Sequence, residues 1–235
     1  MKKPRIYINW SSGKDCCYAL HLLQQQGQFE IAGLLTTVAA EHGRISMHGV
    51  RETLLDEQAA ALGLPLKKVY LPRDYNMQVY EAAMQKTIDE YKQEGCTHAM
   101  FGDIFLEDLR QYRETKLKEQ EITCVFPLWK MDTKALLEKV FGSGIKALVV
   151  CADALLLEKE FAGVELDNKF KSALPGNVDA CGENGEFHTF VFDGPMFTKP
   201  VSFTKGEITL RTYPNQHGTE PPEYKFWYCD LLPAK

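Results

Sequence analysis

The sequence has no pair of cysteines at the C-x-x-C spacing, and its seven cysteines are an odd number. Both facts argue against a disulfide framework and against a structural zinc site. The simplest interpretation is that the thiols are reduced, as they are in cytoplasmic proteins. We therefore expect a cytoplasmic location.

Long apolar runs and an excess of positive charge are also missing. No run approaches the roughly 18 apolar residues that a membrane-spanning helix needs. The stretch after Lys2 and Lys3 is too short and too strand-like for a signal peptide. The 27 basic and 32 acidic side chains give a net charge of −5, which gives no support for generic nucleic-acid binding. The sequence thus predicts neither a membrane nor a DNA partner.

What the chain does have is a regular alternation of strand-like and helix-like segments through its first two-thirds. The clearest helical pattern covers Asn76–Glu94, where apolar side chains recur every three or four residues. Such alternation predicts an α/β fold with a doubly wound, mainly parallel sheet that binds ligands at the carboxyl ends of its strands. The other expected segments are strands at Arg5–Trp10, Ile31–Val38, Leu66–Leu71, His98–Ile104, Thr123–Phe126 and Ala147–Ala152, and helices at Arg51–Leu62, Asp108–Glu121 and Thr133–Phe141.

The composition changes after about Leu174, where Pro175-Gly176-Asn177 interrupts the alternation. We therefore expect a boundary there, with residues 1–174 forming the α/β binding domain. Residues 175–235 are expected to form a small β-rich C-terminal appendage at the sheet's edge or the mouth of the site. Its predicted strands are Phe187–Phe192, Val201–Phe203, Glu207–Tyr213 and Tyr224–Asp230.

The most informative segment is the loop Ser11-Ser12-Gly13-Lys14-Asp15, between the first expected strand and a helical pattern. A strand, a loop of small residues and a helix N-terminus together form an anion site, because backbone N–H groups and the helix dipole point into the turn. Lys14 adds a positive charge that opposes the helix dipole, which is unfavourable unless an anion is bound. The alternative is an ordinary turn in which Ser12 or Asp15 caps the helix.

Two better-known phosphate motifs do not fit the sequence. A Walker A loop needs a glycine five positions before the Gly-Lys pair and Ser or Thr after it, whereas Ile8 and Asp15 occupy those positions. A loose dinucleotide fingerprint at residues 142–147 closes a helix and leads into a strand, which is the reverse of the required context.

The loop resembles the Ser-Gly-Gly-x-Asp-Ser pyrophosphate loop of the N-type ATP pyrophosphatases. The whole chain resembles the diphthine–ammonia ligase family and its bacterial adenine-nucleotide α-hydrolase-like relatives. Ser12 replaces the first glycine of the family's loop, and Cys16 stands where a hydroxyl contacts pyrophosphate. The motifs that carry the resemblance are Ser11–Cys16, Met47–Val50, Phe101–Ile104, Phe126–Trp129 and, most specifically, Cys181–Thr189.

The resemblance implies that a carboxylate attacks the α-phosphate of ATP, pyrophosphate leaves, and ammonia displaces AMP to form an amide. It further implies that Mg²⁺ is bound by Asp15. Asp103, expected at the carboxyl end of a strand beside the loop, is predicted to be a second metal ligand or a substrate contact. A second possibility for Asp103 is that it caps the following helix. The residues expected to contact the nucleotide are Ser11, Ser12, Gly13, Lys14, Asp15, Cys16, Thr36 and His48.

The same resemblance places the substrate at the segment Gly182–Thr189, which contains two carboxylates and a histidine between glycines. The plain alternative is a hairpin turn with solvated charges, since glycine supplies the positive φ that such turns need. Lys14, Asp103, Glu183, Glu186 and His188 are the predicted catalytic residues. Substrate contacts are expected from Gly182, Glu183, Asn184, Gly185, Glu186, His188, Thr189 and Arg113.

Three functions remain open from the sequence. The first is the ATP-dependent amide ligase, with a carboxylate substrate that is either a small molecule or carried on a protein. The second is a sensor that binds adenine nucleotides without turnover, which Cys16 favours because a thiol is a weaker hydrogen-bond donor than a hydroxyl. The third is a hydrolase that cleaves adenine nucleotides at the α-phosphate. A homodimer is a further expectation.

Overall fold

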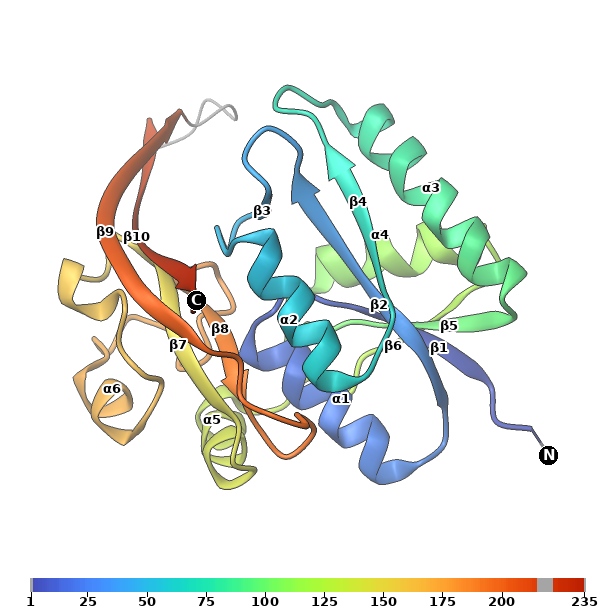
Figure 1. Ribbon diagram of the computed structural model, residues 1–235, viewed down its shortest axis with the longest axis horizontal. Helices are drawn as coiled ribbons and strands as arrows, with labels where there is room; N and C mark the ends of the chain where they lie inside the picture. The colour runs from blue at the N-terminus through green and yellow to red at the C-terminus, as the bar shows by residue number, and fades with distance from the viewer. Residues whose placement is uncertain (1, 215–221, 235) are drawn as a thin grey trace.

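The computed structural model describes residues 2–214 and 222–234, which form two β-sheets with helices around and between them (Figure 1). The first sheet follows the N-terminal half of the chain. Its central strand is β1 (Arg5–Asn9), which pairs in parallel with β2 (Glu30–Ala39) and β5 (Cys96–Met100). Outside them lie β4 (Leu66–Leu71) and β6 (Thr123–Val125), also parallel to their neighbours.

The mainly parallel sheet confirms the expected α/β class. Only the two-residue strand β3 (Arg44–Ile45) runs antiparallel to its neighbour, β2. The central place of β1 follows from its residues, which are buried on both faces: Ile6 and Ile8 point into one apolar cluster and Tyr7 into the other. An alternation that is apolar on both faces is typical of a parallel strand covered by helices.

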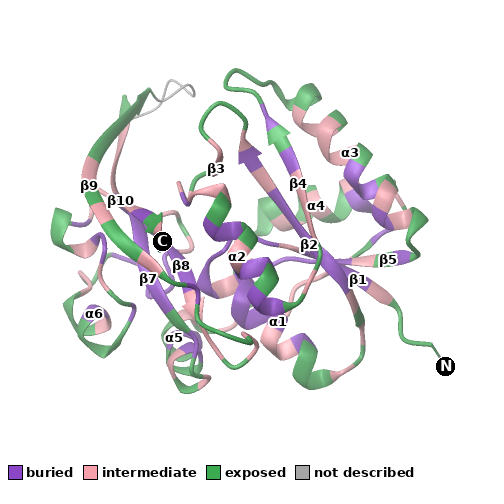
Figure 2. Cartoon of the chain, viewed as in Figure 1, coloured by how far each residue is buried: buried purple, intermediate pink, exposed green. Residues whose placement is uncertain are grey.

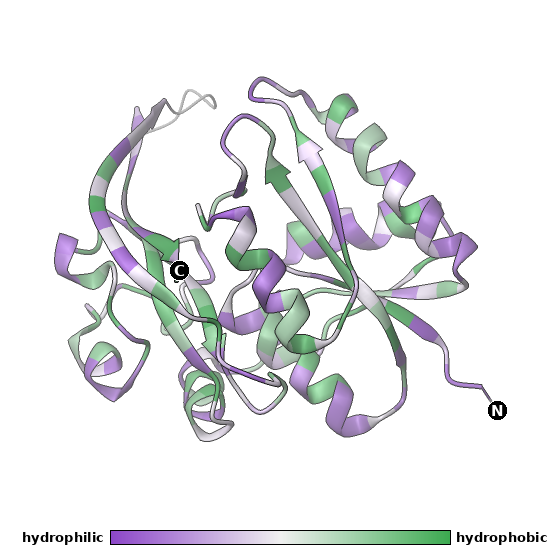
Figure 3. Cartoon of the chain, viewed as in Figure 1, coloured by the Kyte–Doolittle hydropathy of each residue, from purple (hydrophilic) through white to green (hydrophobic). Residues whose placement is uncertain are grey.

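Helices cover both faces of this sheet. Residues of α1 (Lys14–Gln26) and α2 (Glu52–Leu62) enter the same buried cluster as Ile6 and Ile8. Residues of α3 (Met77–Gln93) and α4 (Glu107–Lys118) pack on the opposite face. The buried strands and the amphipathic helices around them are visible in Figures 2 and 3.

The second sheet is antiparallel, and its strands follow the order β8-β7-β10-β9. The strands are β7 (Lys146–Asp153), β8 (Phe187–Asp193), β9 (Phe203–Pro214) and β10 (Glu223–Pro233). Between them lie α6 (Asn168–Ala173) and the 3-10 turn η1 (Lys159–Phe161), while α5 (Thr133–Gly142) precedes β7.

The expectation that Ala147–Ala152 belongs to the parallel sheet is wrong, because β7 pairs only with the antiparallel strands β8 and β10 among the described residues. Short buried apolar runs occur in both parallel and antiparallel sheets, so the sequence of such a strand does not show which strands it pairs with. The chain therefore passes from the first sheet to the second between β6 and β7, which is earlier than the boundary expected after residue 174. The expected strand Glu207–Tyr213 lies within one long strand, β9, whereas of the expected strand Val201–Phe203 only Phe203 belongs to it.

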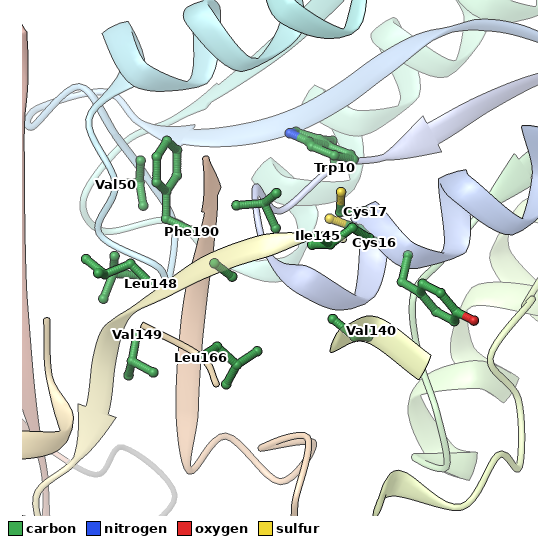
Figure 4. Close-up of a cluster of buried hydrophobic side chains, with 14 of the residues drawn as sticks. Trp10, Cys16, Cys17, Val50, Val140, Ile145, Leu148, Val149, Leu166 and Phe190 are labelled. Atoms are coloured by element: carbon green, nitrogen blue, oxygen red, sulfur yellow. The ribbon is translucent and has the colours of Figure 1, made fainter. Parts of the chain in front are cut away.

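The two sheets share one apolar core. Figure 4 shows Trp10, Cys16 and Cys17 of the first βα unit close to Val140, Ile145 and Phe190 of the second half. This packing fixes β8 against the N-terminal end of α1, where the candidate site lies. In the described part of the chain, no helix is long and apolar enough to cross a bilayer.

Glycine 33 in β2 allows a close approach between elements and provides a test of the fold. A Cβ there would lie 2.8 Å from the Pro65 carbonyl oxygen and 2.9 Å from the Tyr91 hydroxyl. We expect Gly33→Ala to lower the free energy of unfolding by about 1–3 kcal/mol, as other overpacked cores do. The control is Gly142→Ala in α5, where nothing lies within 4 Å of the added methyl. Chemical denaturation measures both variants, and equal stability of Gly33→Ala and wild type would contradict the close approach.

Candidate functional site

A cavity of about 720 Å³ opens at the carboxyl edge of the first sheet and extends under α3 and α4. The sequence-predicted residues that line it are Ser11, Lys14, Asp15, Cys16, Thr36, His48, Asp103, Arg113, Gly182, Glu183, Asn184, Gly185, His188 and Thr189. Three predicted residues, Ser12, Gly13 and Glu186, do not line it. The first sheet and the β7–β8 connection thus contribute to one cavity, although they are far apart in sequence.

The loop after β1 leads directly into the N-terminus of α1. Gly13 is the N-cap residue and makes no side-chain cap bond. The first N–H groups of a helix lack acceptors within the helix, and the N–H of Lys14 is instead bonded to Thr189 Oγ1 on β8, at 3.0 Å. Neither Ser12 nor Asp15 caps the helix, so the plain-turn alternative does not describe this loop.

Lys14 is almost fully buried, with 2% of its surface exposed. Its ammonium group lies 2.9 Å from Asp15 Oδ2, donates to the Cys181 carbonyl and lies 5.0 Å from the centre of the Phe187 ring. Burial alone would lower the pKa of Lys14, but the Asp15 carboxylate outweighs burial and raises it. Lys14 therefore stays charged and joins the loop to the turn that begins at Cys181.

Thr36 and Cys16 support the loop from within. Thr36 at the end of β2 donates its hydroxyl to the carbonyl of Trp10, at 2.7 Å. The sulfur of Cys16 lies 3.2 Å from the Ser11 hydroxyl and 3.2 Å from the Gly13 carbonyl. Burial raises the pKa of the Cys16 thiol to about 11, so it is protonated at neutral pH. A neutral, hydrogen-bonded thiol braces the loop and is not an activated nucleophile.

Asp103 lies where the parallel sheet should place it, at the carboxyl side of β5 beside the loop. It pairs with Arg113 of α4, whose guanidinium lies 4.4 Å from the centre of the Phe101 ring. The N-cap of α4 is Leu106, without a side-chain cap bond, so Asp103 does not cap that helix. Burial raises the pKa of Asp103, Arg113 opposes this rise, and the nearby charge of Asp15 adds to it.

The two glutamates of the Gly182–Thr189 segment have different surroundings. Glu183 faces the cavity, and its Oε1 accepts the N–H groups of Ile104 and Phe105 at 2.7 and 3.3 Å. Burial raises the pKa of Glu183 to about 7, although these two hydrogen bonds act in the opposite direction. Glu183 is therefore poised to gain or lose a proton near neutral pH.

Glu186 is buried inside the turn, away from the cavity. Its two carboxyl oxygens accept the backbone N–H groups of Asp179 and Asn184, at 3.0 and 2.9 Å. This corrects the expectation that Glu186 is a catalytic residue and a substrate contact, because it does not line the cavity and both of its oxygens already shape the turn.

Asp179 is a residue of this turn that the sequence analysis missed. It accepts the N–H groups of Cys181 and Glu183, and the hydroxyl of Thr133 lies 2.6 Å from it. The only available signal was an aspartate shortly before a glycine, which is common in turns.

His48 and His188 form a pair of imidazole rings, with their centroids 4.6 Å apart. His48 Nδ1 lies 3.2 Å from the Thr189 carbonyl, which fixes the ring beside Gly13. His188 Nε2 is buried without a partner among the described residues. Burial lowers the pKa of His188 to about 4 and also lowers that of His48, so both rings are neutral at neutral pH.

Asp15 and Asp103 fit the oxygen ligands that Mg²⁺ prefers. Asp15 Oδ1 is buried with no hydrogen-bond partner among the described residues, and the Asp15 charge raises the pKa of Asp103. Within the described ranges there is no cluster of three or more side chains able to hold a metal ion unaided. Sites with one or two carboxylates are typical of Mg²⁺ that is bound together with phosphates.

Glycine 102 brings β5 and α1 together beneath the site. A Cβ at this position would lie 2.8 Å from the backbone nitrogen of Cys16. We expect Gly102→Ala to displace the α1 N-terminus and to weaken pyrophosphate binding at least tenfold, because such displacements are costly in binding geometry. Gly176→Ala is the control, since nothing lies within 4 Å of its added methyl. Calorimetric titration with pyrophosphate measures the effect, and unchanged affinity in Gly102→Ala would refute it.

The raised pKa of Glu183 predicts a pH-dependent loss of stability. The folded protein holds this proton more tightly than the unfolded chain does, so its contribution is complete below pH 4.5 and is lost as the pH rises to about 7. Across that window we expect the wild type to lose up to about 3 kcal/mol relative to Glu183→Gln. Denaturation of both proteins between pH 4 and 8 tests this, and a difference that does not vary with pH would contradict it.

Comparison with known proteins assigns the family. The model of the diphthamide synthase N-terminal domain matches residues 4–122, and that of the C-terminal domain matches residues 132–215. The chain is 24% identical to diphthine–ammonia ligase of Danio rerio over 86% of its length and 87% of that protein. It is also 24% identical to the Homo sapiens enzyme, over 88% of the chain and 86% of the relative.

One solved structure was also found to be similar in part. It is a predicted subunit of tRNA methyltransferase from Methanocaldococcus jannaschii, with 17% identity and a TM-score of 0.41 over 61% of this chain and 80% of that one. This likeness carries no weight for function. Since the two domain models together cover most of the sequence, the chain belongs to the diphthamide synthase family.

Proposed function

We propose that this chain is an ATP-dependent ligase that joins a carboxylate to ammonia through an acyl-adenylate. The observation that carries the proposal is the shared cavity. It is lined both by the N-terminus of α1, with its charged lysine, and by a carboxylate with a pKa near 7. The relatives are named for joining diphthine to ammonia, and we extend that reaction class to this chain.

In the first step, a carboxylate oxygen of the acceptor attacks the α-phosphorus of ATP. The bond to the bridging oxygen of the β-phosphate breaks, and pyrophosphate leaves with the electron pair. The N-terminus of α1 and the Lys14 ammonium oppose the negative charge that develops on the leaving group. Arg113, held by Asp103, adds a second cation to the cavity lining.

Mg²⁺ bound by Asp15 and Asp103 would neutralise phosphate charge in this step. Without a metal, burial raises the pKa of Asp103 by desolvation, and repulsion by the nearby Asp15 carboxylate adds a smaller rise. A cation between them removes this repulsion, which supports their assignment as ligands.

In the second step, the nitrogen of ammonia attacks the carbonyl carbon of the acyl-adenylate, and AMP leaves. The attacking nitrogen must lose a proton, and ammonia must first be released from ammonium. We assign proton acceptance to Glu183, whose pKa of about 7 suits proton transfer at neutral pH. The neutral rings of His48 and His188 add no positive charge that would repel ammonium.

The reaction test compares products with and without an acceptor. The protein is incubated with ATP, Mg²⁺ and ammonia, separately with pools of carboxylates and with a diphthine-bearing protein. We expect AMP and pyrophosphate in equal amounts, formed only when an acceptor is present, with Glu183→Gln reducing turnover by roughly 10²–10⁴-fold.

Each alternative has its own outcome in this test. AMP without any acceptor identifies an adenine-nucleotide hydrolase, and tight ATP binding without products identifies a sensor. Either result would overturn the ligase proposal. Cys16→Ser is a useful companion variant, because it restores the hydroxyl of the related pyrophosphate loops. A rise in turnover of this variant would show that the thiol limits the rate.

A further inference from the structure

We propose that Gln58 is a positioning residue that orients the Ser12–Gly13 peptide of the loop for phosphate binding. Gln58 lies on α2, outside every motif of the sequence and outside the cavity lining. This inference rests on the proposed function in one respect, namely that the loop binds the phosphates of ATP.

Every polar atom of the Gln58 amide is used to hold the loop. The side chain is completely buried. Its Oε1 accepts the indole N–H of Trp10 at 3.0 Å, and its Nε2 donates to the carbonyl oxygens of Ser12, at 3.2 Å, and Val191. Gln58 therefore joins α2, both sides of the loop and β8 at one point. A buried amide is costly unless it is fully hydrogen-bonded, so this residue is poorly replaced by an apolar one.

The bond to the Ser12 carbonyl decides where the next N–H group points. In a trans peptide the C=O and the following N–H lie in one plane and point in opposite directions. The Ser12 oxygen accepts from two donors in the interior, Gln58 Nε2 and the backbone N–H of Val191 at 2.9 Å. The N–H of Gly13 then points away from Gln58 and donates to the hydroxyl of Ser11 at 3.4 Å. Ser11 lines the cavity, so this N–H lies one side chain behind the cavity wall and is directed toward it.

The backbone conformation of Ser12 explains why the loop needs these hydrogen bonds. Its φ is +72°, a left-handed conformation that costs a non-glycine residue on the order of 1 kcal/mol. Its hydroxyl is buried without a partner among the described residues, so no hydrogen bond of the side chain offsets this strain. A change of the Ser12 φ to a negative value would relieve the strain, and it would also move the Ser12 carbonyl and the Gly13 N–H to new directions. The two donors to the Ser12 carbonyl oppose that change.

The experiment measures binding of pyrophosphate, and separately of ATP, by calorimetry with Mg²⁺ present. Gln58→Met keeps the length of the side chain but removes the donor. We expect it to weaken pyrophosphate binding about tenfold while the protein remains folded at the assay temperature. In the Gln58→Met background, Ser12→Gly should restore most of the affinity, because glycine adopts positive φ without strain. The gain from Ser12→Gly should be larger there than in wild type.

A second variant separates orientation from packing. Gln58→Glu keeps the shape and the acceptor for Trp10, but it can donate to the Ser12 carbonyl only when the carboxyl is protonated. We expect the ratio of its pyrophosphate affinity to that of wild type to rise toward one as the pH falls from 8 to 5. A purely structural residue would lower the melting temperature without this recovery and without rescue by Ser12→Gly.

The outcomes distinguish this inference from the proposed function. If wild type binds neither pyrophosphate nor ATP, the proposed function fails. If wild type binds both and Gln58→Met binds equally well, Gln58 is not a positioning residue. Weakened binding that Ser12→Gly does not rescue would also overturn the inference, because the loss would then come from packing. Because the experiment measures only the binding of pyrophosphate and ATP, the comparison between variants does not depend on the identity of the carboxylate acceptor.

Discussion

The buried ammonium group of Lys14 is the contact on which the site depends. It joins the Ser11–Asp15 loop to the Cys181–Thr189 turn, because it contacts both the Asp15 carboxylate and the Cys181 carbonyl. Removing one member of a buried ion pair leaves the other charge uncompensated, at a cost of about 3–5 kcal/mol. Lys14 therefore secures the position of the turn as well as adding charge to the site. The loop and the turn can face the same ligand only because this group lies between them.

The second sheet completes the site instead of merely covering it. Thr189 on β8 accepts the N–H of Lys14, and its carbonyl fixes His48 from the first half of the chain. The cap of α1 therefore comes from a residue far along the sequence. A β1–α1 unit by itself would lack this cap, and it would also lack Glu183 and the histidine pair. This arrangement explains why both halves pack around one apolar core (Figure 4).

Local chemistry made the loop and the position of Asp103 predictable from the sequence. A strand, small residues and a helix start are adjacent in the chain, and parallel strands bring their carboxyl ends to one edge. Contacts between distant segments could not be predicted. Glu186 looked like Glu183 in sequence, yet Asp179 and Asn184 use both of its oxygens. Gln58 resembled an ordinary polar helix residue, because its buried contacts are made with distant parts of the chain, Trp10, Ser12 and Val191.

Burial gives the cavity a chemical property that its composition does not suggest. Water exclusion keeps the histidine pair neutral and raises the pKa of Glu183 to about 7, while Lys14 keeps its charge through Asp15. In the proposed reaction, protonated Glu183 would reduce repulsion when a polyphosphate enters, and the carboxylate left after loss of that proton would accept a proton from ammonium. A single carboxyl group near its pKa would thus serve an anionic and then a cationic substrate in turn. Asp103 is already paired with Arg113 and is proposed to bind Mg²⁺, which is why the proton transfer is assigned to Glu183.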